Sequence, residues 1–324
     1  MPKIPKVSII IAVYKQIKDL SKAINTVLQQ TYANYEIIVC SNNILANLED
    51  LNLLADSRLR FVFNQSPDLF QAFNRGIFNA KGKYITFLNI QDRWHQYKLQ
   101  KQVSCLEHYP KAGLVYSWMM QINSQDQSLE KVLKQDDSGW IQSDILQRNH
   151  ISYQSVMVRR RCFEVMGLFD SKLNSIQDWD MWIRLSDRYR FVIIPEPLVF
   201  CQRKKICADE TWLKMETNLQ KAIEKAYSKV AIEASNLKKS HSYAYASLCL
   251  AWEVLNHHKP DPVIADNYRR QAIEHSPSIS FSLNFIKMSI AIATLKCLKK
   301  ENYTRLGKLI QASQKFLIAN SQKL

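Results

Sequence analysis

Polar side chains follow three of the β-branched apolar runs in this sequence, at the point where each run ends. They are Tyr14, Ser41, Asn89, Gln91 and Asp92. Because ligands of an open parallel sheet bind at the carboxyl ends of its strands, we expect these side chains to converge on one crevice. Hydroxyl and amide groups can hydrogen-bond a ligand, and amide oxygens can join a magnesium or manganese shell without adding charge. The pattern predicts a polar ligand crevice in which Asp92 supplies the carboxylate.

The elements that would position this crevice are alternating strands and helices. Four apolar runs are predicted strands, namely Val7–Tyr14, Tyr35–Cys40, Leu59–Asn64 and Tyr84–Leu88. Such runs are typical of strands buried on both faces, and the segments between them have helical periodicity or helix-start residues. This alternation predicts parallel β-α-β units and a layered α/β domain.

The segments after residue 90 are less regular. Helices are predicted over His95–His108 and Asp178–Arg188, and strands over Ala112–Ile122 and Val156–Val158. The polar segment Asn123–Ser138 is predicted to be a mobile loop over the site. Around Pro195-Glu-Pro197 we expect two separate strand pieces, Arg190–Ile194 and Leu198–Cys201.

A shift in composition after about residue 208 predicts a second region, because strands give way to helical periodicity. The expected domains are residues 1–207 and a basic helical region over residues 208–324. The net charge is +15, and residues 201–324 carry 20 lysines and arginines against 10 acidic residues. This excess favours an anionic partner such as a lipid surface, phosphate groups or an acidic protein; the alternative is a solvated Lys-rich helical surface. We expect no nucleic-acid partner, since the sequence has no Gly-rich phosphate loop, paired cysteines or aromatic RNA-binding motif.

Cysteine usage and hydropathy bear on location. Seven cysteines without a Cys-x-x-Cys pair predict free thiols in a reducing cytoplasm and no zinc site. The apolar start of the chain is short and is expected to be a strand, not a signal peptide. Lysines and an asparagine interrupt Phe281–Leu298, which argues against a spanning helix. That segment could still lie flat on a membrane, so a cytoplasmic protein at the inner membrane face is an open alternative.

Several motifs occur together in an order that resembles the family 2 glycosyltransferases. They are Val7-Ser-Ile-Ile-Ile-Ala-Val-Tyr14, Gln30-Thr-Tyr-Ala-Asn-Tyr-Glu-Ile-Ile-Val39, Ala72-Phe-Asn-Arg-Gly-Ile77 and Gly82-Lys-Tyr-Ile-Thr-Phe-Leu-Asn89. The resemblance covers roughly residues 5–205. It implies a GT-A fold, a nucleotide-sugar donor, a divalent manganese or magnesium ion, and an inverting single displacement.

The resemblance also implies roles for individual residues. Asp178, in Gln177-Asp178-Trp179-Asp180, aligns with the general base that accepts the proton of the acceptor hydroxyl. Ser41 stands where the family has an acid that reads the nucleobase, and Arg203 lies near the family's diphosphate-binding cation. The remaining residues expected at the nucleotide sugar are Tyr14, Asn74, Asn89 and Gln91.

Some positions depart from the family pattern. The metal-binding Asp-x-Asp aligns with Asn89-Ile90-Gln91, and the family's Arg before the kept Asn74 aligns with Phe73. Metal binding should therefore be weakened, with Asp92 the remaining candidate ligand. Structural alternatives are that Asp92 and Asp178 cap helices and that Asp180 pairs with Arg184.

These observations predict a glycosyltransferase that acts on a saccharide or lipid-linked acceptor. The basic helical region would dock it at an anionic membrane surface or an assembly complex. The alternative is a catalytically degenerate homologue that keeps the scaffold for binding, which would account for the departures at Ser41, Phe73, Asn89, Gln91 and Gln177.

Overall fold

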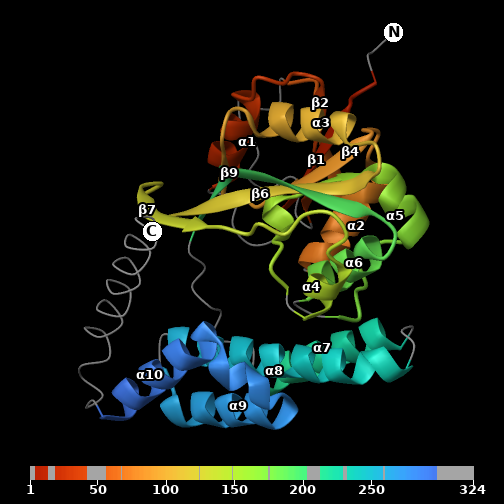
Figure 1. Ribbon diagram of the computed structural model, residues 1–324. Helices are drawn as coiled ribbons and strands as arrows, with labels where there is room; N and C mark the ends of the chain where they lie inside the picture. Colours follow the sequence, from red (N-terminus) through yellow and green to blue (C-terminus); the bar gives the residue numbers. More distant parts are fainter. Residues whose placement is uncertain are drawn as a thin grey trace. The chain divides into compact units, whose positions relative to one another are not determined.

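The protein forms two compact units, residues 1–204 and residues 205–324. The computed structural model describes residues 4–13, 19–41, 56–66, 68–123, 125–147, 149–173, 176–202, 212–228, 232–257 and 260–297. The domain boundary predicted after residue 207 lies outside these residues. Each unit is described separately below (Figure 1).

The first unit is built on one mixed sheet with the strand order β3-β2-β1-β4-β8-β6-β9-β5, and β7 pairs with β6. The strands are β1 (Val7–Val13), β2 (Tyr35–Ser41), β3 (Leu59–Phe63), β4 (Tyr84–Leu88), β5 (Arg93–Trp94), β6 (Ala112–Ile122), β7 (Ser128–Leu133), β8 (Met157–Arg159) and β9 (Arg190–Gln202). Strands β1 to β4 are mutually parallel where they pair, as predicted, and β8 runs antiparallel to β4 and β6.

Helices pack on both faces of this sheet. They are α1 (Leu20–Leu28), α2 (Leu69–Asn79), α3 (Lys98–His108), α4 (Gln142–Gln147), α5 (Arg160–Met166) and α6 (Gln177–Ser186), with a 3₁₀ turn η2 (Tyr153–Ser155). Ile9 and Ile11 of β1 share a core with α1 and α3. Ile10, which points to the opposite face, packs against Gly76 of α2, where a Cβ would lie 2.4 Å from Ile10 Cγ2. Gly76 therefore lets α2 approach the sheet closely.

Tertiary pairing overrides three local predictions. The predicted loop Asn123–Ser138 contains β7, which pairs with β6 after a turn organised by the Asn123 side chain, whose Oδ1 accepts from the backbone N–H groups of Gln125 and Gln127. The two predicted strand pieces form one strand, β9. Its pairing with β6 passes from Ile194 to Pro197, so Pro195 needs no ladder hydrogen bond.

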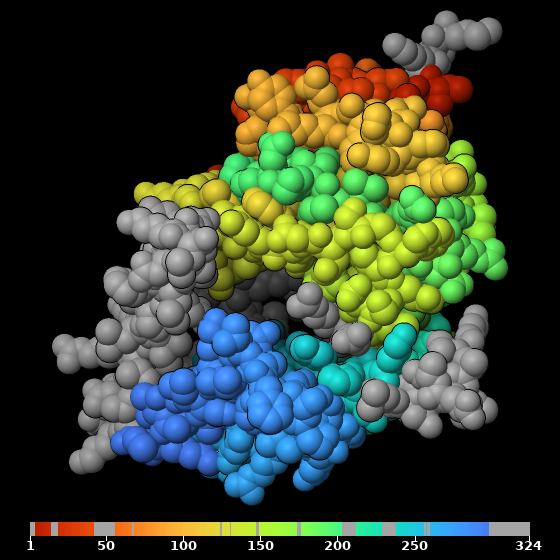
Figure 2. Space-filling model, viewed as in Figure 1, coloured from red at the N-terminus to blue at the C-terminus, as the bar shows by residue number. Residues whose placement is uncertain are grey.

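The third difference concerns the helix predicted from His95. Arg93 and Trp94 pair with β9 as the short strand β5, so the helix begins only at Lys98. In the space-filling view, β9 (green) crosses the surface of this unit between α3 (amber) and the yellow-green segment that follows β6 (Figure 2). The short strands β5 and β7 thus extend the sheet beyond the strands that the sequence predicts.

The second unit consists of helices, as predicted, in the part that the structure describes. They are α7 (Trp212–Tyr227), α8 (Ile232–Asn256), α9 (Pro262–His275), the 3₁₀ helix η3 (Pro277–Phe281) and α10 (Leu283–Cys297). Asp261 caps α9 by accepting from the N–H groups of Val263 and Ile264. Buried Asp266 of α9 pairs with Arg269 and, across to α10, with Lys296. None of the described helices is long and apolar enough to cross a membrane.

Candidate active site

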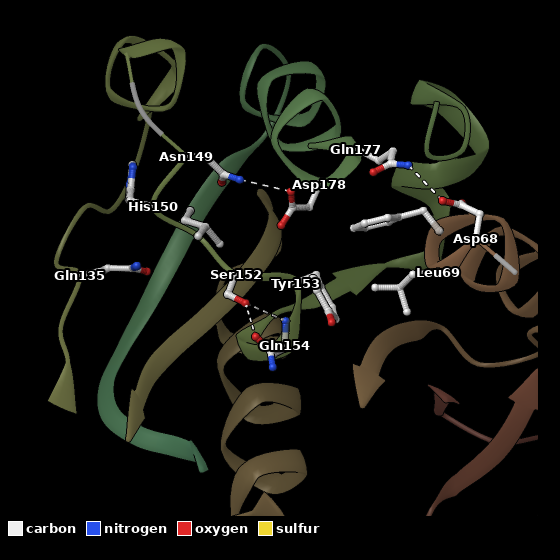
Figure 3. Close-up of a pocket in the computed structure, with 12 residues that line it drawn as sticks. Asp68, Leu69, Gln135, Asn149, His150, Ser152, Tyr153, Gln154, Gln177 and Asp178 are labelled. Atoms are coloured by element: carbon white, nitrogen blue, oxygen red, sulfur yellow. Dashed lines mark hydrogen bonds between the residues drawn. The ribbon is translucent and has the colours of Figure 1, made fainter. Parts of the chain in front are cut away.

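A cleft of about 480 Å³ opens between the start of α2, the start of α6 and the segment that leads into η2. Figure 3 shows the side chains that line it. Its lining residues are Asp68, Leu69, Phe70, Gln135, Asn149, His150, Ile151, Ser152, Tyr153, Gln154, Gln177 and Asp178. Most of the polar members are uncharged amides or hydroxyls, and the described lining contains neither lysine nor arginine.

Asp178 lies in the first turn of α6 and is 9% exposed. Its Oδ1 accepts from the backbone N–H of Trp179 at 2.8 Å and from Asn149 Nδ2 at 3.2 Å. Figure 3 shows the Asn149 and Asp178 side chains facing each other, joined by this hydrogen bond. The helix-capping alternative is wrong for Asp178, because the residue before α6 is Ile176 and Asp178 lies within the first turn, where it lines the cleft.

Two tryptophans of α6 hold the opposite wall in place. The indole N–H of Trp179 donates to Ile145 O at 2.6 Å, and that of Trp182 donates to Ile151 O at 2.9 Å. Both rings are buried, so the segment that carries Asn149 is fixed against α6. Asp180 pairs with Arg184 at 2.8 Å, which confirms the structural reading of that carboxylate.

Asp68 belongs to this site although sequence analysis did not single it out. Its Oδ1 caps α2 by accepting from Gln71 N at 2.7 Å, and its Oδ2 accepts a long hydrogen bond of 3.4 Å from Gln177 Nε2. Gln177 is fully buried, and its Oε1 has no hydrogen-bond partner in the described part of the chain. A glutamine can pair with the Asp68 carboxylate, whereas a glutamate there would repel it. No sequence signal links these positions, which lie 109 residues apart.

The predicted metal-binding segment forms a turn closed by its own hydrogen bonds. Asn89 Oδ1 accepts from Gln91 N at 3.0 Å, and Asn89 Nδ2 donates to the Tyr153 hydroxyl at 3.2 Å. Asp92 is 2% exposed and accepts from Gln154 Nε2. Asp92 does not cap α3, because the residue before that helix is Tyr97.

The donor set around this turn does not fit a divalent metal. Within the described residues, no three histidine, cysteine or acidic side chains come together. The amide oxygen of Asn89 is engaged by a backbone N–H, and buried Asp92 is engaged by an amide. Since amides add no charge, Asp92 is the one carboxylate that this segment offers, which is fewer anionic oxygens than a Mg²⁺ or Mn²⁺ site needs.

The other predicted residues are placed as follows. Ser41 ends β2 and is buried, outside the cleft lining. Asn74 bonds to the backbone of Phe169 in both directions, donating to its O at 2.8 Å and accepting from its N–H at 2.9 Å. Tyr14 and Arg203 lie outside the described residues. The structure therefore places Asn89 and Asp92 against η2, and Asp178 shares the cleft lining with Tyr153 and Gln154 of η2. Asn74 instead ties α2 to the loop before α6.

An aromatic cluster occupies the position where the resemblance places an arginine. Phe73 is fully buried, and its ring centroid lies 4.6 Å from that of Phe87 and 5.3 Å from that of Tyr153. Phe70 and Phe169 complete the cluster. A charged guanidinium would be costly there, and the cluster instead supports Tyr153, which lines the cleft.

The fold and the sequence both relate this chain to known glycosyltransferases. A mannosyltransferase from Pyrobaculum calidifontis, solved in complex with GDP-Man and Mn²⁺, superposes with a TM-score of 0.57, 16% identity, and coverage of 99% of this chain and 87% of that chain. An uncharacterized glycosyltransferase of Rickettsia prowazekii is 30% identical over 185 residues, 56% of this chain and 58% of the relative. The amylovoran biosynthesis glycosyltransferase AmsB of Erwinia amylovora is 27% identical over 212 residues, 59% of this chain and 67% of the relative.

These findings identify the class of protein. The first unit has the GT-A glycosyltransferase fold, and a helical region follows it. Residues 8–162 match the family model described as glycosyl transferase family 2. The chain spans less than two thirds of the length of the Rickettsia relative.

Proposed function

We propose that the first unit transfers a sugar from a nucleotide-sugar donor to a hydroxyl of a saccharide or lipid-linked acceptor, with Asp178 as general base. The observation that carries the proposal is the position of Asp178 on the cleft wall, with Oδ1 held by two donors. The match of residues 8–162 to glycosyl transferase family 2 supports the reaction class.

The reaction would be a single displacement. The acceptor oxygen bonds to the anomeric carbon while the bond from that carbon to the diphosphate breaks, and the acceptor proton passes to Asp178. Attack opposite the leaving group inverts the anomeric centre. A positioned base of this kind contributes about 10²–10⁴-fold in rate.

The chemistry of the cleft favours the acceptor as its occupant. Asn149, Ser152 and Gln154 offer uncharged hydrogen-bonding groups, and Tyr153 offers an aromatic ring. A diphosphate would find no lysine or arginine in this described lining. Saccharide hydroxyls are therefore the better match, and AmsB, a relative named for polysaccharide biosynthesis, supports this acceptor class.

The donor diphosphate would need a cation from elsewhere in the chain. The segment over residues 89–92 does not supply the carboxylates for a metal, so we derive no step through one. We propose Arg203, Tyr14 and Ser41 as donor contacts, on the resemblance alone. In this scheme transfer depends little on added Mn²⁺.

A second candidate function is that of a binding scaffold without catalysis. The observation that favours it is that the side chains of Asn89 and Asp92 hydrogen-bond to other protein groups, so this turn is held in place without a metal ion. Donor turnover without added Mn²⁺ discriminates between the two functions, because the proposed enzyme turns over the donor and the scaffold does not. In the double variant Asn89→Asp/Gln91→Asp, a gain of Mn²⁺-dependent nucleotide binding would indicate a weakened metal site and would count against the scaffold.

The experiment that tests the main proposal is calorimetric titration with UDP-, GDP- and dTDP-sugars, with and without Mn²⁺. We expect binding of at least one donor, and an Asp178→Asn variant that keeps donor affinity but loses turnover. Asp187→Asn is the matched control, because it makes the same chemical change at the exposed end of the same helix. Absence of donor binding at millimolar concentration would instead establish the scaffold function.

We further propose that the basic helical region docks the protein on anionic lipids at the inner face of a membrane, in the cytoplasm. The support is the charge excess of residues 201–324 and the free thiols of the described cysteines. Neutralising lysines on α7 and α10 should weaken binding to vesicles that contain phosphatidylglycerol. Vesicle binding that is unchanged by this neutralisation would refute the docking.

A further inference from the structure

A second, strongly basic pocket lies at the end of the sheet opposite the carboxyl ends of β1, β2 and β4. Its volume is about 410 Å³. Six of its ten lining residues are lysine or arginine and one is glutamate, and the six are Lys6, Lys81, Lys83, Arg159, Arg160 and Arg161. Neither the candidate active site nor the family match assigns a role to this set.

The strand register places these cations side by side. Val7 of β1 pairs with Tyr84 of β4, and Tyr84 pairs with Arg159 of β8. The residues just outside these pairs are joined by backbone hydrogen bonds, from Tyr84 N to Lys6 O at 3.0 Å and from Arg160 N to Lys83 O at 2.9 Å. Neighbouring strands lie about 4.8 Å apart, so one cation from each strand falls on a single rim.

The charge on this rim is only partly neutralised. Lys6 Nζ and Lys83 Nζ share one oxygen, Glu107 Oε1, at 3.1 and 3.0 Å. Arg160 Nη1 lies 3.4 Å from Glu164 Oε1. Two carboxylates thus face a larger number of cations, and Lys81 makes no ion pair with any described residue.

Two guanidinium groups distinguish this pocket from a solvated lysine surface: that of Arg159 is buried, and that of Arg160 is partly exposed with a buried Nε. Arg159 is 5% exposed and donates to the backbone carbonyls of Leu106, Tyr109 and Ala112. Within the described residues, the dipoles of these carbonyls balance its charge, and no carboxylate does. The buried Nε of Arg160 lacks a hydrogen-bond partner within the described residues. Like charges gathered in a concave site raise its positive potential, which an anion would offset.

We propose that this pocket binds a phosphate group. Several guanidinium and ammonium groups line this concavity, and such groups suit phosphate oxygens. The phosphate could belong to a soluble phosphate compound or to an anionic lipid headgroup, and the test separates these sources. The site is independent of the transfer reaction, because it shares no residue with the candidate active site.

The experiment compares two double variants with the unmodified full chain. Lys81→Gln/Arg160→Gln removes two charges from the pocket, and Lys22→Gln/Lys172→Gln removes two exposed charges of the same unit outside it. Inorganic pyrophosphate is titrated by calorimetry, and flotation measures binding to vesicles of equal parts phosphatidylcholine and phosphatidylglycerol. Circular dichroism and urea unfolding check the fold, and Lys81→Gln alone serves if the pocket double variant is unstable.

We expect the pocket variant to weaken binding about tenfold or more, and the control variant to weaken it less than about threefold. If the pocket variant binds pyrophosphate more weakly, the ligand is a soluble phosphate compound. If only its binding to vesicles is weaker, the ligand is a lipid headgroup. Equal losses in the two variants would overturn the proposal, since the charge would then act without a defined site. Absence of binding to either probe would overturn it as well.

Discussion

Replacing Gln177 with glutamate tests the coupling between the two acidic walls of the cleft. Gln177 Nε2 donates to Asp68 Oδ2 at 3.4 Å, and Gln177 is fully buried. Gln177→Glu would place two carboxylates at this distance. Two unit charges about 4 Å apart repel by about 4 kcal/mol at an effective dielectric of about 20. Because Asp68 is partly exposed, we expect the free energy of unfolding to fall by about 2–4 kcal/mol at pH 8.

The assay is urea unfolding at pH 8 and pH 5, with a compensating variant as control. The loss should shrink at pH 5, since protonation of one carboxylate removes the repulsion. Gln177→Glu/Asp68→Asn should recover most of the stability, because the introduced amide can donate to the introduced carboxylate while its oxygen still caps α2. An equally stable Gln177→Glu variant at pH 8, or a double variant as unstable as the single one, would refute the reasoning.

Three further predictions concern stability. Burial of Lys98, whose Nζ donates to Gln102 and Thr86, lowers its pKa well below the ordinary value. Unfolded Lys98 therefore binds a proton over a pH range in which the folded form does not, so the free energy of unfolding rises with pH up to the unfolded pKa of about 10.4. In this range the contribution of Lys98 changes the unfolding constant by up to about tenfold per pH unit, and Lys98→Met should remove that contribution. Identical pH dependence of the two proteins in urea titrations would contradict this. Hydrogen bonds from Tyr84 and Lys83 lower the pKa of Glu107 to about 2, so Glu107 stabilises the fold above pH 4.5 and this contribution is lost as the pH falls toward 2. Acid titration of Glu107→Gln by circular dichroism should show a shallower loss, and an unchanged profile would count against it. Gly76→Ala should lower the free energy of unfolding by about 1–3 kcal/mol because of the contact with Ile10, and a neutral effect in urea would mean that Ile10 repacks freely.

Much of the first unit follows from local patterns in the sequence. The four β-branched runs form the parallel strands, because residues such as Ile9, Ile10 and Ile11 are buried on both faces. The strands β5 and β7 are not predicted by such patterns. Each is short or polar, and each forms because a partner strand already lies beside it. Pairing that depends on tertiary neighbours leaves little trace in local sequence.

The candidate site divides in the same way. Asp178 is found by its motif, and the structure places it on the cleft wall. The resemblance does not find Asp68, Asn149 or Gln154, because their roles come from contacts with distant residues. The departures from the family pattern at Phe73 and Gln177 are explained only by the three-dimensional structure. Phe73 joins an aromatic cluster, and Gln177 faces the carboxylate of Asp68.

The most direct test of the proposed function is release of nucleoside diphosphate from the donor that calorimetry identifies, measured for the unmodified chain and for Asp178→Asn and Asp187→Asn. The proposal predicts that Asp178→Asn lowers turnover about 10²–10⁴-fold at nearly unchanged donor affinity, and that Asp187→Asn turns over normally. Equal turnover of Asp178→Asn and the unmodified chain would contradict the assignment of Asp178 as the base.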